Sequence, residues 1–232
     1  MFYFGWYSLI PIPGVLLALY AQFKLRSVYN RYQNVPQSRG MTGAQVARAI
    51  LDRADLHDVA IEPVPGELTD HYDPRERVLR LSESNFQVSS LSAIGVAAHE
   101  AGHALQHKEK YAPLEARMAV VGVTNFATNG GLILFMIGMF IHSGLLLQLG
   151  IWLYSAMVVF QLITLPVEYD ASARAKRVLA DLGFVNREEG EAIRQVLGAA
   201  ALTYVAALAT AALELLRMIL LSGAMRDRDE RA

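Results

Sequence analysis

The chain has 232 residues, of which 53% are hydrophobic and 19% charged, with 21 basic against 22 acidic side chains and no cysteine. The balanced charge argues against a nucleic-acid partner, and the absence of cysteine excludes a disulfide-stapled secreted module. A mean hydropathy of +0.27 is too high for a disordered chain or an ordinary soluble domain, and it indicates membrane helices.

The first charge-free stretch is residues 1–23. Its aromatic residues and its interruption at Pro11, Pro13 and Gly14 predict a kinked first membrane span. The stretch lacks the basic start and the small-residue cleavage site of a signal peptide, so we expect a retained anchor rather than a cleaved leader.

Residues 24–117 mix polar and apolar side chains, as a small water-exposed domain requires. Thr42 and Gln45 form a capping box that predicts a helix to about Leu56. Short strands are expected at 59–62, 68–72 and 78–82.

The turn sequence at residues 73–76 has Asp first and Pro second, so it predicts a hairpin that pairs strand 68–72 with strand 78–82. Strand 78–82 is also a candidate for pairing with an extended peptide substrate through main-chain hydrogen bonds. A serine at position 89, 90 or 92 is expected to cap the next helix, which runs to about Lys108.

The second charge-free stretch, residues 118–167, is 50 residues long. At about 20 residues per crossing it can traverse a bilayer twice. His142-Ser143-Gly144 lies near its middle, so the sequence predicts a helical hairpin with spans of about 118–141 and 145–167.

Two further helices are predicted after this hairpin. The first covers residues 168–182 and is closed by Gly183. The second is capped by Asn186 with Glu189 and turns apolar over residues 196–213, which predicts a fourth span. A half-buried helix packed on the other helices is the alternative.

The sequence His99-Glu100-Ala101-Gly102-His103 matches the HExxH pattern. On a helix, His99 and His103 share one face about 6 Å apart, so both imidazoles can bind one zinc ion at ~2.1 Å. Glu100 would lie beside the metal, where it can take a proton from the attacking water and pass it to the leaving amine.

A catalytic zinc needs a third protein ligand. His107 is eight residues past His99, about 12 Å along a helix axis, and is too far to share the metal. Glu168 fits better because it begins the first charged segment after the hairpin, although a solvated helix-start carboxylate is the alternative. Asp170 or Ser172 could orient a ligating imidazole.

The chain resembles the YugP-type membrane zinc metallopeptidases, also called neutral zinc metallopeptidases. Four matching pieces occur in order: LTDHYDPR at 68–75, VAAHEAGHALQH at 96–107, LPVEYDASARA at 165–175 and AAALTYVAAL at 199–208. The resemblance implies a membrane-embedded protease with one zinc ion on His99, His103 and Glu168, and with Glu100 as the base.

The chain is also distantly similar to HtpX and the CAAX prenyl proteases, which place an acidic residue four positions after the glutamate ligand. Here position 172 is Ser and the acid stands at Asp170, so the residue that orients the ligands differs. His71 and Tyr72 precede the hairpin turn and are candidates for contacting substrate or stabilising the oxyanion. A structural role on the strand is the alternative for both.

We therefore expect a mainly α-helical membrane protein with about four transmembrane helices and a small α+β zincin-like domain on one face. The segments are an anchor (1–23), the zincin-like domain (24–117), the hairpin (118–167), and a ligand-bearing helix with a C-terminal membrane helix (168–232). The expected function is a zinc-dependent endopeptidase that acts on a peptide or membrane-protein substrate at the bilayer. A membrane-tethered zinc sensor without turnover is the alternative.

Basic residues near the expected span ends predict the topology. Lys24 and Arg26 follow the first span, Arg117 precedes the second, and Arg174 and Lys176 follow the third, whereas residues 142–144 contain none. By the positive-inside tendency the active site faces the cytoplasm of a bacterial inner membrane.

Overall fold

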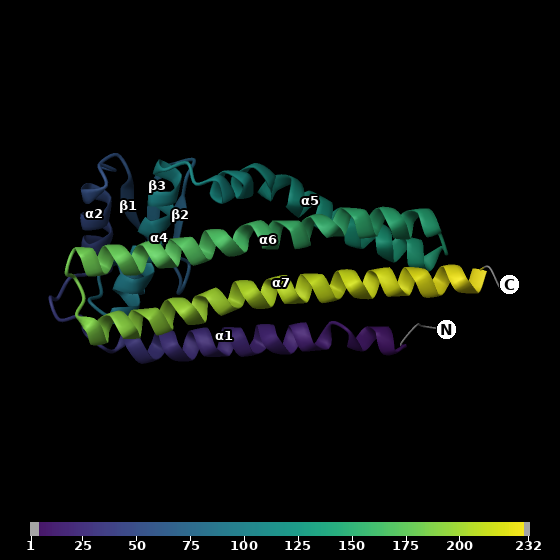
Figure 1. Ribbon diagram of the computed structural model, residues 1–232, viewed down its shortest axis with the longest axis horizontal. Coiled ribbons are helices and arrows are strands. Elements are labelled where there is room, and N and C mark those ends of the chain that lie inside the picture. Colours follow the sequence, from purple (N-terminus) through teal and green to yellow (C-terminus); the bar gives the residue numbers. More distant parts are fainter. Residues whose placement is uncertain (1–4, 230–232) are drawn as a thin grey trace. The chain divides into compact units, whose positions relative to one another are not determined.

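The computed structural model describes residues 5–229 (Figure 1), so the ends of the predicted first and last segments lie outside the described residues. The described chain is mainly helical and contains one small sheet. The helices are η1 (Trp6–Leu9), α1 (Ile12–Gln33), α2 (Gly43–Arg53), α3 (Glu83–Phe86), α4 (Leu91–Lys108), α5 (Ala112–Phe140), α6 (Gly144–Asp181) and α7 (Arg187–Asp229). The strands are β1 (Ala60–Val64), β2 (His71–Asp73) and β3 (Val78–Ser82).

Within the described residues, four helical segments are long and apolar enough to cross a membrane: Trp6–Gln33, Ala112–Phe140, Gly144–Asp181 and Arg187–Arg226. The predicted hairpin is present as α5 and α6. The predicted interruption of the first span is present at Ile10 and Pro11, where the 3-10 helix η1 gives way to α1, whereas α1 itself runs past Pro13 and Gly14 without a break. Proline is tolerated in a first helical turn, where its missing N–H would have no partner in the helix.

Helix α6 does not end where the charged residues begin. We expected a separate helix over 168–182, but α6 is a single helix that includes Pro166 and Glu168 (Figure 1). A change from apolar to charged side chains does not end a helix, and α6 continues through Pro166, although this proline has no N–H to donate to the carbonyl four residues earlier. A single helix therefore contains both the apolar segment and the candidate ligand.

The chain divides into two compact units. Unit 1 comprises residues 1–21, 116–165 and 203–232. Within it α5 and α6 approach closely: a Cβ atom on Gly150 would lie only 2.7 Å from the carbonyl oxygen of Gly131. Small residues allow such backbone contacts between membrane helices. The buried cluster of this unit comprises Phe135, Leu147, Ile151, Tyr154, Met218, Leu221 and Met225.

Unit 2 comprises residues 22–115 and 166–202. It contains α2, α3, α4, the sheet, and the adjoining parts of α1, α6 and α7. Apolar side chains from the helices and from β3 form one core, whose largest fully buried members are Val46, Ile50, Leu51, Leu79, Leu81, Ile94, Leu179 and Ile193.

The local start signals in unit 2 are confirmed. Thr42 caps α2 in a reciprocal capping box with Gln45, and Ser90 is the serine that caps α4. The Asp73 carboxylate accepts hydrogen bonds from the N–H groups of Arg75 and Glu76, which fixes the predicted turn.

The sheet has the strand order β1-β3-β2, with β2 antiparallel and β1 parallel to β3. The predicted hairpin is therefore present, but β3 is the central strand. The prediction that residues 78–82 pair with a substrate is wrong, because both edges of that strand already bond to neighbouring strands. The edges available among the described strands belong to β1 and β2.

Strand β1 contains a proline at position 63. The Ala60 N–H donates to the Arg77 carbonyl, on the β3 side of the strand. Amide groups alternate in direction along a strand, so position 63 points its backbone nitrogen away from β3. Proline is compatible with such an outward position on an edge strand.

Candidate metal centre

The two motif histidines lie one turn apart in the middle of α4. Their rings are arranged edge to face with centroids 4.8 Å apart, and their side chains are only 13% and 12% exposed. Ser90 caps α4 nine residues before His99 by accepting a hydrogen bond from the Ala93 N–H. Both imidazoles are therefore held on a well-anchored helix within unit 2.

Helix α6 brings Glu168 to these histidines. One carboxylate oxygen, Oε2, lies 3.2 Å from His99 Nε2 and 3.5 Å from His103 Nε2. One ligand atom from each of the three residues lies within 4.8 Å of the others, and Glu168 is 2% exposed. Ligands at ~2.1 Å around a tetrahedral zinc are about 3.4 Å apart, so this donor set fits the ion.

Gly102 permits the close approach of α4 and α6 at the site. A Cβ atom at this position would lie 2.7 Å from the carbonyl oxygen of Ala171, inside van der Waals contact. Ala171 lies one turn after Glu168 in the chain, so the glycine lets the glutamate-bearing turn pack directly on the histidine-bearing turn.

Glu100 is buried next to this group, with 8% of its surface exposed. Within residues 5–229, no hydrogen bond or ion pair engages its carboxylate. A buried carboxylate without a partner is costly, and such groups in native sites normally face an ion, a water molecule or a substrate. Glu100 is thus buried, and its carboxylate has no partner among the described residues that would prevent it from accepting a proton.

The outward ring nitrogens of the two histidines have different partners. Ser172 Oγ lies 3.2 Å from His99 Nδ1, which agrees with the expectation that Ser172 orients a ligand. Asp170 instead bonds to Gln106, and the Gln106 Oε1 lies 2.9 Å from His103 Nδ1. The sequence reasoning missed Gln106, although its position three residues after His103 on the same helix was an available signal.

The remaining candidates lie apart from the three grouped residues. His107 is one turn beyond His103 and its Nδ1 lies 2.9 Å from the Tyr72 hydroxyl. Burial raises the pKa of Tyr72, so its hydroxyl stays protonated at neutral pH. His71 is exposed on β2, with its Nδ1 2.8 Å from the Thr69 carbonyl.

The site favours positive charge. Burial disfavours protonation of His103, but the carboxylates of Glu168 and Glu100 outweigh this effect and raise the pKa of its imidazole above the ordinary value. The negative potential that holds a proton there also attracts a metal cation.

Comparison with known proteins agrees with this geometry. The sequence model of a family described as "Putative neutral zinc metallopeptidase" matches residues 7–223. The chain is 49% identical over 221 residues to the "Putative membrane protease YugP" of Bacillus subtilis (strain 168), covering 95% of this chain and 97% of the relative. No solved structure matches the chain significantly.

Proposed function

Because the chain belongs to the neutral zinc metallopeptidase family, we propose that it is a membrane-embedded zinc endopeptidase in which Glu100 is the general base. The observation that supports this most strongly is the buried group of His99, His103 and Glu168 with the unpaired Glu100 carboxylate beside it. A closed structural zinc site has four protein ligands and no use for such a carboxylate.

The proposed chemistry assigns each residue a task. His99, His103 and Glu168 hold one zinc ion per chain, which when bound polarises the scissile carbonyl and acidifies the attacking water. Glu100 accepts the proton from that water and delivers it to the leaving amine. Burial of the site keeps competing water away from these groups.

Tyr72 is proposed to contact the substrate. Its hydroxyl lies 2.9 Å from His107 Nδ1, and His107 is on the helix face that also contains the motif histidines. A donor in this place can bond the carbonyl oxygen of a bound peptide as negative charge develops on it. His71 receives no such role, because its imidazole is exposed and lies against the Thr69 carbonyl.

We place the protein in the bacterial inner membrane with the site on the cytoplasmic side. The support is the set of basic residues that flank the membrane helices near unit 2, such as Lys24, Arg117 and Arg174. The substrate is then a peptide, or a peptide segment of a membrane protein, that reaches the bilayer surface from the cytoplasm.

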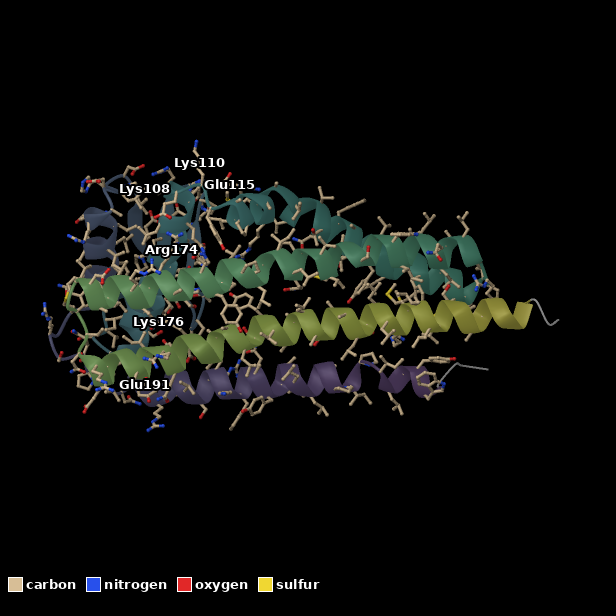
Figure 2. All side chains as sticks on the ribbon, viewed as in Figure 1. Lys108, Lys110, Glu115, Arg174, Lys176 and Glu191 are labelled. Atoms are coloured by element: carbon tan, nitrogen blue, oxygen red, sulfur yellow. The ribbon has the colours of Figure 1, made fainter. Side chains whose placement is uncertain are left out.

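The test compares the purified full-length protein with its Glu100→Gln and Glu115→Gln variants. Glu115 is an exposed carboxylate on α5 and serves as the matched control (Figure 2). Bound zinc and cleavage of a fluorogenic unfolded protein are measured on the same samples. We expect all three proteins to bind one zinc, and Glu100→Gln alone to lose at least about a hundredfold in turnover.

Two results would change the conclusion. Near-wild-type cleavage by Glu100→Gln would remove that residue from the mechanism. Stoichiometric zinc in the wild-type protein with no cleavage of any peptide or membrane substrate would favour a zinc sensor.

A further inference from the structure

We infer that Gln106 is a positioning residue for the metal site: it fixes the ring tautomer of His103 and holds the turn of α6 that contains Glu168. This inference rests on the proposed zinc site. Gln106 has no exposed surface, and its amide contacts one group on α4 and two groups on α6.

The orientation of the Gln106 amide follows from its partners. Its Nε2 lies 2.8 Å from the Val167 carbonyl oxygen and 2.8 Å from Asp170 Oδ2, and both of these atoms only accept hydrogen bonds. The NH₂ group must therefore face α6. The amide oxygen then faces His103 Nδ1, 2.9 Å away.

This orientation determines where the imidazole proton sits. An amide oxygen cannot donate, so His103 Nδ1 must bear the hydrogen and donate it to Gln106. In the neutral ring the lone pair is then on Nε2, the nitrogen that lies 3.5 Å from Glu168 Oε2. His103 is thereby prepared to bind a cation through Nε2.

The acceptors on α6 are themselves held in place. Arg174 Nε lies 2.5 Å from Asp170 Oδ2, and Arg174 Nη1 lies 2.6 Å from Oε2 of Glu109, the residue directly after α4 (Figure 2 labels Arg174). Arg174 therefore holds the Asp170 carboxylate in place against Gln106. These contacts therefore link Gln106 on α4, through Asp170 and Arg174 on α6, to Glu109 at the C-terminal end of α4.

His99 lacks an equivalent constraint. Its Nδ1 faces the hydroxyl of Ser172, which can both donate and accept, so this contact does not choose the tautomer. The Gln106 amide also bonds the carbonyl of Val167, the residue directly before Glu168. A single side chain thus orients one ligand and anchors the backbone next to another.

The test replaces Gln106 by Met, which has a similar volume but no hydrogen-bonding amide. The matched control is Gln37→Met, because Gln37 is also buried and its amide bonds three backbone groups, at Phe184, Arg39 and Met41. Zinc affinity is measured by chelator competition on the full-length protein. In the cobalt-substituted protein, the exchangeable imidazole N–H signals of the ligands are followed by NMR.

We expect Gln106→Met to weaken zinc binding by about 10- to 100-fold and to speed solvent exchange of the His103 N–H, while the His99 signal stays in place. Gln37→Met should lower the melting temperature and leave the zinc affinity and the His103 N–H exchange rate at wild-type values. Gln106→Glu keeps an acceptor for His103 and should retain more affinity than Gln106→Met.

The outcomes separate this inference from the function on which it rests. Wild-type protein that binds no zinc through its histidines would overturn the proposed site itself. Normal zinc affinity and an unchanged His103 signal in Gln106→Met would leave the site intact and overturn the role of Gln106. Equal loss of affinity in the Gln37 and Gln106 variants would show a general effect on the fold and also overturn it.

Discussion

Glu168 is separated from His99 by 69 residues, yet its carboxylate lies within hydrogen-bond distance of that imidazole. We predict that Glu168→Ala lowers zinc content to the same degree as His103→Ala, since each removes one of three ligands. His107→Ala should keep nearly full occupancy, because its imidazole is about 12 Å along the helix from His99. Metal analysis of the purified variants checks this; equal loss in the His107 and His103 variants would contradict the ligand assignment.

The raised pKa of His103 gives the site a defined pH dependence. Protons compete with zinc for the His103 imidazole. The Glu168 and Glu100 carboxylates stabilise its protonated form, so it holds a proton more tightly than a histidine in water does. As the pH is lowered, zinc affinity should therefore begin to fall while the pH is still above about 6.5, the ordinary pKa of histidine, and it should fall further as the pH is lowered below that value.

The stability of the zinc-free protein should change in the opposite direction. A pKa raised by folding contributes stability that is complete below about pH 6.5 and is lost as the pH rises through the raised value. Chelator competition and thermal unfolding between pH 5 and 8 measure the two effects. Zinc affinity that stays flat over this range would contradict the role of His103.

At the level of the elements, the packing of α4 on α6 depends on Gly102. We predict that Gly102→Ala forces the two helices apart, because its Cβ atom would lie 2.7 Å from the Ala171 carbonyl oxygen. The variant should lose both thermal stability and zinc affinity. Gly198→Ala is the control: Gly198 lies within α7 and a Cβ atom there meets open space, so the change should stabilise the helix by up to about 1 kcal/mol. Similar behaviour of the two variants would refute the close-packing argument.

Signals confined to one turn of chain could be predicted from the sequence. The Thr42 capping box, the serine cap of α4 and the Asp73 turn each depend on residues within three or four positions of one another. The spacing of the motif histidines is equally local, since one helical turn decides it.

Features that depend on distant segments could not be predicted in the same way. The parallel pairing of β1 with β3 joins strands that no turn connects directly, so the hairpin signal gave only the antiparallel half of the sheet. The charge pattern predicts a boundary at Glu168, whereas α6 continues from the apolar segment through Pro166 to Asp181. The contact of Gln106 with His103 is local and could have been predicted, whereas its bonds to Val167 and Asp170 on another helix could not.

At the level of the whole molecule, one zinc can bind residues before and after the hairpin only if the chain crosses the bilayer and returns. The chain has no cysteine, so single cysteines report the side of the membrane cleanly. We predict that Gly144→Cys, at an exposed and open position, reacts with an impermeant maleimide added to intact cells. Gln87→Cys, exposed in unit 2, should react only after permeabilisation.

The labelling result has two informative alternatives. The reverse pattern would place the metal site on the outer side of the membrane. Equal labelling of both cysteines in intact cells would contradict a hairpin that crosses twice.

The proline in β1 affects how readily two copies of this protein can associate through the edges of their sheets. An edge strand with free N–H groups invites strand addition from a second chain and so promotes aggregation. At position 63 the outward-facing donor is missing, so an incoming strand would meet a gap in its hydrogen-bond ladder. Strand addition along β1 is thus disfavoured, whereas β2 contains no proline that would interrupt such a ladder.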